Sequence, residues 1–212
     1  MDDLTLYTNP MSRGRIAHWM IEEVGRPYRT VYLGFGAAMH TPEYLRLNPM
    51  AKVPTLVHGG TVVTECAAVC AYLADAFPEA GLAPEPARRG AYYRWLFFAA
   101  GPLEAAVTNQ ALGVEVPEKS LGFVGYGSLA RVVDALETAV AGDGYIAGER
   151  FSAADVYVGS QIGFGLRFDT IEARPALVAY WQRIENRPAA VRARALDDAA
   201  MPAKAPAGKD EA

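Results

Sequence analysis

The amino-acid sequence predicts two domains, a small mixed α/β domain followed by a domain made only of helices. Two observations carry this prediction. Short strand-like runs alternate with helical spacing over residues 1–78, whereas strand signals almost vanish after residue 87. Residues 79–86 contain Gly81, Pro84 and Pro86 and are typical of a linker. At 212 residues, the chain is long enough to bury a sizeable core in this arrangement.

The first domain is expected to have the order β-α-β-α-β-β-α. Polar–apolar alternation and β-branched residues predict strands at 4–7, 28–33, 53–57 and 61–63. Helical spacing predicts a helix between Ser12 and Gly25 and further helices at 41–47 and 65–77. The dipeptide Gly59-Gly60 separates the last two strands as a hairpin turn does.

The second domain, residues 87–201, is expected to contain helices near 87–112, 119–141, 153–167, 175–186 and 188–199. Ser152-Ala153-Ala154-Asp155 resembles a capping box, with Phe151 placed as a hydrophobic staple. Residues 202–212 are too polar to pack, and we expect a disordered tail there.

Composition limits the possible partners and compartment. The net charge of −4 gives no electrostatic reason to expect nucleic acid or an anionic membrane as partner. No signal peptide or apolar run long enough to span a membrane is recognisable. The two cysteines, Cys66 and Cys70, suit a disulfide poorly, which favours unpaired thiols and a cytoplasmic protein. The three histidines have no metal-site spacing, so we expect no metal.

The most informative segment is Asn48-Pro49-Met50-Ala51-Lys52-Val53-Pro54-Thr55-Leu56, followed by Thr64-Glu65-Cys66. Pro54 cannot donate to a strand ladder, and a cis peptide there would leave the backbone of Val53 free to pair with an extended peptide ligand. Glu65-Cys66 lies where a strand gives way to a helix, whose N-terminus favours a carboxylate. The alternative interpretation of Val53-Pro54 is that the proline only protects the edge of a sheet from pairing and that no ligand binds there.

This pattern resembles the glutathione-binding half of the cytosolic glutathione transferase family, which carries Asn-Pro-x-Gly-Lys-Val-Pro-x-Leu and then Glu-Ser before a helix. The resemblance implies a thioredoxin-like first domain, glutathione as co-substrate, and glutathione contacts from Lys52, Val53, Pro54, Glu65 and Cys66. Ala51 and Cys66 replace the family's usual glycine and serine. Because cysteine is the weaker donor, Cys66 is as well explained as a small buried apolar residue.

The resemblance continues through the second half, in Phe151-Ser152-Ala153-Ala154-Asp155, Ala179-Tyr180-Trp181 and Arg187-Pro188-Ala189. It implies a homodimer, which is also the commonest form of symmetric assembly.

The turn after the first strand is the candidate catalytic segment. A group at a helix N-terminus can stabilise a bound thiolate, and a hydroxyl that donates to sulfur lowers the thiol pKa. Ser12 has this chemistry, and the resemblance to bacterial-type members with a serine at this turn supports it. Asn9 and Tyr7 are the alternative donors, and simple N-capping is the structural explanation of Ser12.

A pocket for an electrophile is expected between the domains. Met11, Tyr93, Phe97 and Phe164 are its candidate lining residues, with Phe98 and Phe168 as further aromatics, although ordinary core packing explains each of them as well.

The predicted function is transfer of the glutathione thiolate to a small apolar electrophile. The alternatives are a glutathione-dependent reductase, isomerase or dehalogenase that uses the same site, or a non-catalytic ligand- or protein-binding protein on this scaffold.

Overall fold

The computed structural model of the protein describes residues 4–202. Its first part is a four-stranded sheet in the order β2-β1-β3-β4. The strands are β1 (Leu4–Thr8), β2 (Arg29–Tyr32), β3 (Thr55–His58) and β4 (Thr61–Val63). β1 pairs in parallel with β2, with Tyr7 opposite Val31, and antiparallel with β3, with Tyr7 opposite Thr55. β3 and β4 form the predicted hairpin.

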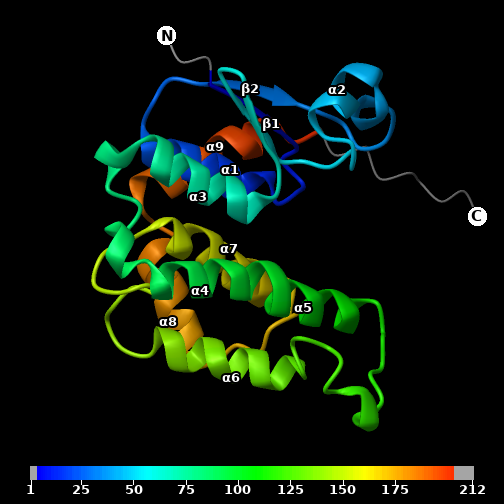
Figure 1. The fold of residues 1–212 in the computed structure, drawn as a ribbon, viewed down its shortest axis with the longest axis vertical. Coiled ribbons are helices and arrows are strands. Elements are labelled where there is room, and N and C mark those ends of the chain that lie inside the picture. Colours follow the sequence, from blue (N-terminus) through cyan, green and yellow to red (C-terminus); the bar gives the residue numbers. More distant parts are fainter. Residues whose placement is uncertain (1–3, 203–212) are drawn as a thin grey trace, which may run out of the picture.

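Helices α1 (Gly14–Val24) and α3 (Cys66–Ala76) form a layer between the sheet and the helical part of the molecule, and α2 (Pro42–Leu47) lies away from this layer (Figure 1). α1 ends where Gly25 adopts a left-handed conformation, with φ of 71°. Thr41 caps α2, and Pro42 occupies its first turn, as the sequence predicts. A short 3₁₀ helix at Ala37–His40, which the sequence analysis did not predict, precedes α2.

The helical part consists of α4 (Gly90–Phe98), α5 (Glu104–Ala111), α6 (Leu129–Val140), α7 (Ala153–Arg167), α8 (Pro175–Ile184) and α9 (Pro188–Ala199). Short 3₁₀ turns lie at Pro78–Ala80, Pro86–Arg88 and Glu118–Ser120. The capping box of α7 is confirmed, because the Ser152 and Asp155 side chains bond reciprocally to the backbone. The disordered tail predicted for 202–212 lies, from residue 203 on, outside the described residues.

Two predicted helices differ from the observed ones. The helix expected at 87–112 is divided by a π-helical segment, Ala99–Leu103, which contains Pro102. Proline has no N–H for the α-helical ladder, so the backbone widens locally around it. The helix expected at 119–141 begins only at Leu129, after its N-cap Ser128. Gly122, Gly125 and Gly127 lie in the loop before it and disfavour a helix there.

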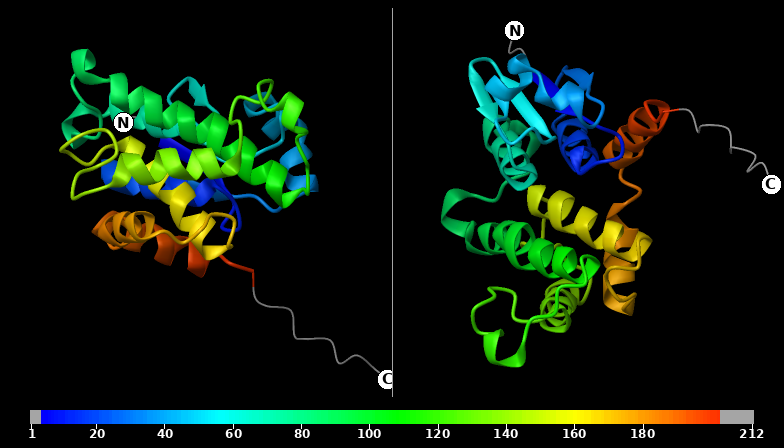
Figure 2. Two further views of the ribbon diagram at one scale, coloured as in Figure 1. Left: turned by 90° about the horizontal axis from the view of Figure 1, so that it is seen from below. Right: turned by 90° about the vertical axis from the view of Figure 1, so that its right-hand side faces the viewer.

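The last helix does not stay with the second part of the chain. α9 returns to pack along α1, which Figure 2 shows in the right-hand view. α3 and α1 in turn pack against α7. The buried apolar residues therefore form one continuous cluster that runs from Leu4 in β1 to Ala193 in α9.

Candidate active site

A cavity of about 900 Å³ opens where the loops of the sheet face the helical part. The first part of the chain contributes Pro10, Met11, Ser12, Arg13, Arg15, Phe35, Gly36, Met39, His40, Ala51, Lys52 and Val53. The second part contributes Leu103, Val107, Gln161, Phe164, Gly165, Arg167, Phe168, Thr170 and Met201. The cavity thus joins the two segments that the sequence analysis selected with an apolar wall, as is typical of ligand sites.

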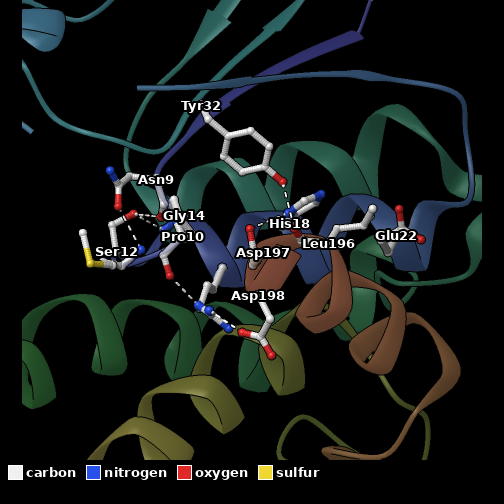
Figure 3. A network of polar contacts seen from close by, with 12 residues as sticks. Asn9, Pro10, Ser12, Gly14, His18, Glu22, Tyr32, Leu196, Asp197 and Asp198 are labelled. Carbon is white, nitrogen blue, oxygen red and sulfur yellow. Dashed lines mark hydrogen bonds and ion pairs between the residues drawn. The ribbon is translucent and has the colours of Figure 1, made fainter. Parts of the chain in front are cut away.

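Ser12 lies in the turn between β1 and α1, on the wall of this cavity. Its hydroxyl donates to the carbonyl of Asn9 at 2.7 Å and accepts from the N–H of Gly14 at 2.9 Å (Figure 3). The hydroxyl therefore helps to order the start of α1, and its proton points into the turn. A thiolate is a stronger acceptor than a carbonyl and can compete for that proton.

The other two candidates for the sulfur contact are placed differently. Asn9 is buried, and its amide is engaged in the turn: Nδ2 donates to the carbonyl of Leu33 at 2.7 Å, and Oδ1 accepts from the N–H of Met11 at 2.8 Å. Tyr7 packs its ring on Tyr44, with the centroids 5.7 Å apart. Neither Asn9 nor Tyr7 lines the cavity.

Val53 and Pro54 adopt the geometry that the sequence suggested. The peptide bond between them is cis. Within residues 4–202, neither the N–H nor the C=O of Val53 has a hydrogen-bond partner. By contrast, the neighbouring carbonyl of Lys52 accepts from Tyr44 and from Asn48 Nδ2 at 2.9 Å. Val53 thus offers a free backbone edge at the cavity, and Pro54 next to it is buried.

Glu65 and Cys66 lie at the start of α3, outside the lining of the cavity. Glu65 has φ of 63°, a conformation that L-residues rarely adopt and that is often found at functional sites. Cys66 is buried, and its thiol donates to the carbonyl of Arg13 over 3.5 Å. This contact joins the N-terminus of α3 to the turn that carries Ser12. Both cysteines are free, as predicted.

The structure brings only some of the predicted electrophile-pocket residues to the cavity. Met11 and Phe164 line it, and so does Phe168. Tyr93 and Phe97 do not, since they lie on the outer face of α4 and are 42% and 73% exposed. They are four residues apart and share one helical face, whereas the buried residues Tyr92, Trp95 and Leu96 hold the other.

Several lining residues were not found by the sequence analysis. Phe35, Met39 and His40 come from the loop and 3₁₀ helix before α2, and Leu103 comes from the π-helical segment. Gln161 and Arg167 come from α7. Their spacing on α7, six residues, carries no pattern by itself, and only the approach of α7 to the Ser12 turn gives them a role.

Polar contacts from α9 reach the same turn. Arg15 donates from Nε to the carbonyl of Pro10, and its Nη2 lies 2.6 Å from Oδ1 of Asp198. Beside this pair, Asp197 meets the ring of His18 at 2.8 Å, and both side chains are almost completely buried (Figure 3). Helix α9 thus holds α1, and through Arg15 it holds the backbone of the turn.

Within residues 4–202, no group of His, Cys, Asp and Glu is arranged to hold a metal ion. None of the described helices is both long and apolar enough to cross a bilayer.

Comparisons with known proteins agree in both halves of the chain. The family model for the glutathione S-transferase N-terminal domain matches residues 2–75, and the model for the glutathione S-transferase C-terminal domain matches residues 118–188. Glutathione S-transferase 3 of Zea mays is 29% identical over 89% of this chain and 92% of its own length. Glutathione S-transferase F10 of Arabidopsis thaliana is 28% identical over 88% and 94%.

Solved structures show the same relationship. A glutathione transferase from Methylococcus capsulatus superposes with a TM-score of 0.74 at 28% identity, over 92% of this chain and 99% of its own. A sphingomonad glutathione S-transferase in complex with glutathione gives a TM-score of 0.74 at 28% identity, over 92% and 98%. Since the two family models together cover more than half of the sequence and the folds agree over nearly all of it, the chain belongs to the glutathione S-transferase family.

Proposed function

We propose that this glutathione transferase binds reduced glutathione along the free backbone of Val53 and transfers its sulfur to an electrophilic carbon held against α7. The observation that carries the proposal is the cavity itself. It joins a strand edge with unpaired backbone groups, a hydroxyl at the N-terminus of α1 and an apolar wall. A tripeptide thiol and an apolar electrophile are what these surfaces suit.

In this proposal the charged groups at each end of glutathione meet protein groups of complementary charge. Lys52 lies beside Val53 on the wall and suits a carboxylate. At the other end, Glu65 suits the α-ammonium group, and the backbone N–H of Cys66, at the start of α3, suits the α-carboxylate. Val53 acts through its main chain, and Pro54 fixes its position. The cysteinyl sulfur then lies toward the turn that carries Ser12.

The chemical step needs a thiolate and a leaving group. The thiol loses its proton to solvent, and the field of the α1 N-terminus and the Ser12 hydroxyl favour the resulting anion. The sulfur attacks the electrophilic carbon, a C–S bond forms, and the bond to the leaving group breaks with its electron pair. Proximity in one cavity and a lowered thiol pKa are the catalytic contributions. The role of Asn9 is to shape the turn.

Calorimetric titration with reduced glutathione, and with S-hexylglutathione beside it, tests the binding step. Lys52→Ala is the loss variant, and Lys119→Ala, in the 3₁₀ turn before α6, is its matched control. We expect saturable binding that weakens about tenfold in Lys52→Ala only, the effect of a lost charge-assisted hydrogen bond. Absence of binding at millimolar glutathione would instead favour a scaffold without catalysis.

An electrophile screen then separates the transferase from a carrier or from a reductase of the same fold. A reductase that forms a mixed disulfide through its own thiol needs a cysteine at the turn, where this chain has Ser12. We further propose a cytoplasmic homodimer, in line with the unpaired thiols and with the commonest symmetry of soluble assemblies. Analytical ultracentrifugation measures the assembly directly.

A further inference from the structure

The formally charged side chains on the cavity wall are all cationic. The wall is lined by Arg13, Arg15, Lys52 and Arg167 together with the imidazole of His40, and none of its lining residues, all within the described part of the chain, is aspartate or glutamate. The protein as a whole carries a net charge of −4, so this local excess of basic groups is not a reflection of its composition. A cleft of this kind favours anionic ligands.

Four of these basic groups already have a role or a partner. Lys52 and His40 lie on the side where the proposed function places glutathione, which brings its own carboxylates. Arg13 pairs with Glu104 at 2.9 Å, and Arg15 pairs with Asp198 at 2.6 Å. The charges of these two arginines are therefore largely neutralised by carboxylates outside the cavity.

Arg167 is the exception. It is the last residue of α7, it is exposed, and within residues 4–202 it forms no ion pair. The neighbouring acid, Asp169, lies outside the lining of the cavity. The guanidinium carbon of Arg167 lies 5.7 Å from the ring centre of Phe168. A guanidinium held over an aromatic ring keeps its N–H donors available at the ring edge for a planar anion.

The surroundings of Arg167 define the rest of the ligand. Phe164 and Phe168, with ring centres 6.5 Å apart, lie beside it on the wall, and Leu103 and Val107 add further apolar surface. Gln161 and Thr170 supply uncharged polar groups. This wall suits an aromatic ring. It lies on the helical side of the cavity, across from Lys52 and Val53.

Arg167 also borders a second cavity of about 430 Å³ between α1, α7, α8 and α9. That cavity is lined by Arg15 and Arg194 and also by the carboxylates of Glu185 and Asp197, so its charges are mixed, whereas the described lining of the first cavity contains no carboxylate. An anionic ligand of Arg167 is therefore favoured on the side of the first cavity, next to the proposed site of the sulfur.

We propose that the electrophile of this enzyme is an aromatic compound with an anionic substituent, a carboxylate or sulfonate, and that Arg167 binds this substituent. The inference rests on the proposed function, because it names the class of the second substrate of that site. Arg167 is a specificity-determining residue in this reaction: it fixes the ring on the apolar wall and takes no part in the proton or electron movements.

Two substrates that differ only in charge test the inference. In 4-chloro-3-nitrobenzoate and 4-chloro-3-nitrobenzamide, the thiolate replaces chloride: a C–S bond forms, the C–Cl bond breaks, and chloride leaves. Each kcat/KM is divided by the rate constant of the same electrophile with free glutathione thiolate, which removes the difference in intrinsic reactivity. We expect the normalised value to favour the benzoate by about tenfold, as a charge-assisted hydrogen bond predicts.

Three variants assign the preference to its residue. Arg167→Gln should abolish it mainly through the KM of the benzoate, and Arg167→Lys should retain part of it. Arg131→Gln, on the exposed face of α6 and away from both cavities, should leave it unchanged. Turnover of both compounds with no preference for the benzoate, or a preference that survives in Arg167→Gln, would overturn the inference and leave the transferase function intact.

Calorimetry keeps the inference testable without turnover. With S-methylglutathione saturating the first subsite, the benzoate should bind about tenfold more tightly than the benzamide, and Arg167→Gln should remove the difference. If neither compound is turned over but this difference is measured, the transferase proposal fails for these electrophiles and the anion site stands. Equal affinities would contradict the anion site itself.

Discussion

At the scale of single residues, Ser12 has two tasks in one hydroxyl. It orders the turn through Asn9 and Gly14, and it lies on the cavity wall where sulfur is expected. The first task needs the oxygen as an acceptor for the N–H of Gly14. The second needs the proton, which the turn holds only through the carbonyl of Asn9. Both tasks are compatible, because rotation about the Cβ–Oγ bond of Ser12 redirects the hydroxyl hydrogen bond from the Asn9 carbonyl to a ligand without moving the oxygen.

Replacing Ser12 with alanine separates these tasks. Without the hydroxyl, the pKa of the bound glutathione thiol should rise by about one unit. Less thiolate is then present at a pH below that pKa, and kcat/KM for the electrophile, measured at saturating glutathione, should fall about tenfold near neutral pH. The pH dependence of kcat/KM and the ultraviolet absorbance of the bound thiolate measure the change. Ser12→Thr keeps a hydroxyl and should retain most activity.

The same variant should cost about 1 kcal/mol of unfolding free energy through the lost hydrogen bond from the N–H of Gly14, which thermal unfolding reports separately. An unchanged pH profile in Ser12→Ala would show that the field at the N-terminus of α1 acts on sulfur without the hydroxyl.

Cys66, like Ala51, is a residue at which this chain departs from the family motif. Its thiol is a weak donor, and it lies 3.5 Å from the carbonyl of Arg13. We expect Cys66→Ser to tighten glutathione binding about twofold to tenfold, the net value of one hydrogen bond. Titration calorimetry measures the Kd.

Cys70→Ala is the matched control for Cys66→Ser. Cys70 is fully buried and outside the lining of the cavity, and burial, with the neighbouring Cys66 thiol, raises the pKa of its thiol well above the usual value, so it stays neutral. Its replacement should leave the Kd unchanged. A weaker affinity in Cys66→Ser would mean that the site is fitted to the larger sulfur atom.

At the scale of secondary-structure elements, the packing of α9 against α1 is the unexpected feature. The periodicity of this segment predicted a helix at 188–199, and the structure has α9 at Pro188–Ala199, but nothing in its own sequence says which surface it covers. The partner surface on α1 is recognisable only when both helices are seen together, through Arg15 with Asp198 and His18 with Asp197.

Asp198→Asn tests whether α9 positions the turn that carries Ser12. The Asp198 side chain is 60% exposed, so its ion pair with Arg15 should contribute at most about 1 kcal/mol to folding. The loss of that pair should nevertheless loosen Arg15 and the Pro10 carbonyl that it holds. We expect kcat to fall about threefold to tenfold with a small change in stability, since modest misplacement of reacting groups is costly.

Arg192→Gln provides the comparison for Asp198→Asn. It removes an ion pair between the same two helices, with Glu22, but it does not touch the turn. Its kcat should match that of the unmodified enzyme. Equal losses of kcat in both variants would indicate that the docking of α9 as a whole matters, and that Asp198 has no special role.

The ends of a helix could be predicted from the sequence where residues at that end set them, and they were missed elsewhere. Gly25, the Thr41-Pro42 start and the Ser152–Asp155 capping box determine helix ends through their own backbone and side-chain bonds, and these ends were predicted. The late start of α6 and the π-helical segment at Pro102 were missed, because a periodic apolar pattern continues across both. At the site, the motif residues were predictable, whereas Arg167 and Gln161 depend on the packing of α7.

At the scale of the whole molecule, the two sequence-defined domains share one core. The buried cluster is continuous from Leu4 to Ala193, and α1 lies in contact with α3, α7 and α9. We therefore expect one cooperative unfolding transition, with near-ultraviolet and far-ultraviolet circular dichroism curves that coincide and equal calorimetric and van't Hoff enthalpies. Two separated transitions would show that the domains fold independently despite this shared core.

The return of α9 to α1 also has a consequence for the order of events on the ribosome. Synthesis runs from the N-terminus, so α1 leaves the exit tunnel long before the helix that covers it has been translated. Until α9 has emerged up to Ala199, His18 and the face of α1 around it stay exposed to water, and the first domain lacks the helix that covers it. A nonsense codon just after Arg187 would leave every proposed glutathione contact in the product and still release a chain whose α1 is uncovered, which is a target for chaperones and proteases.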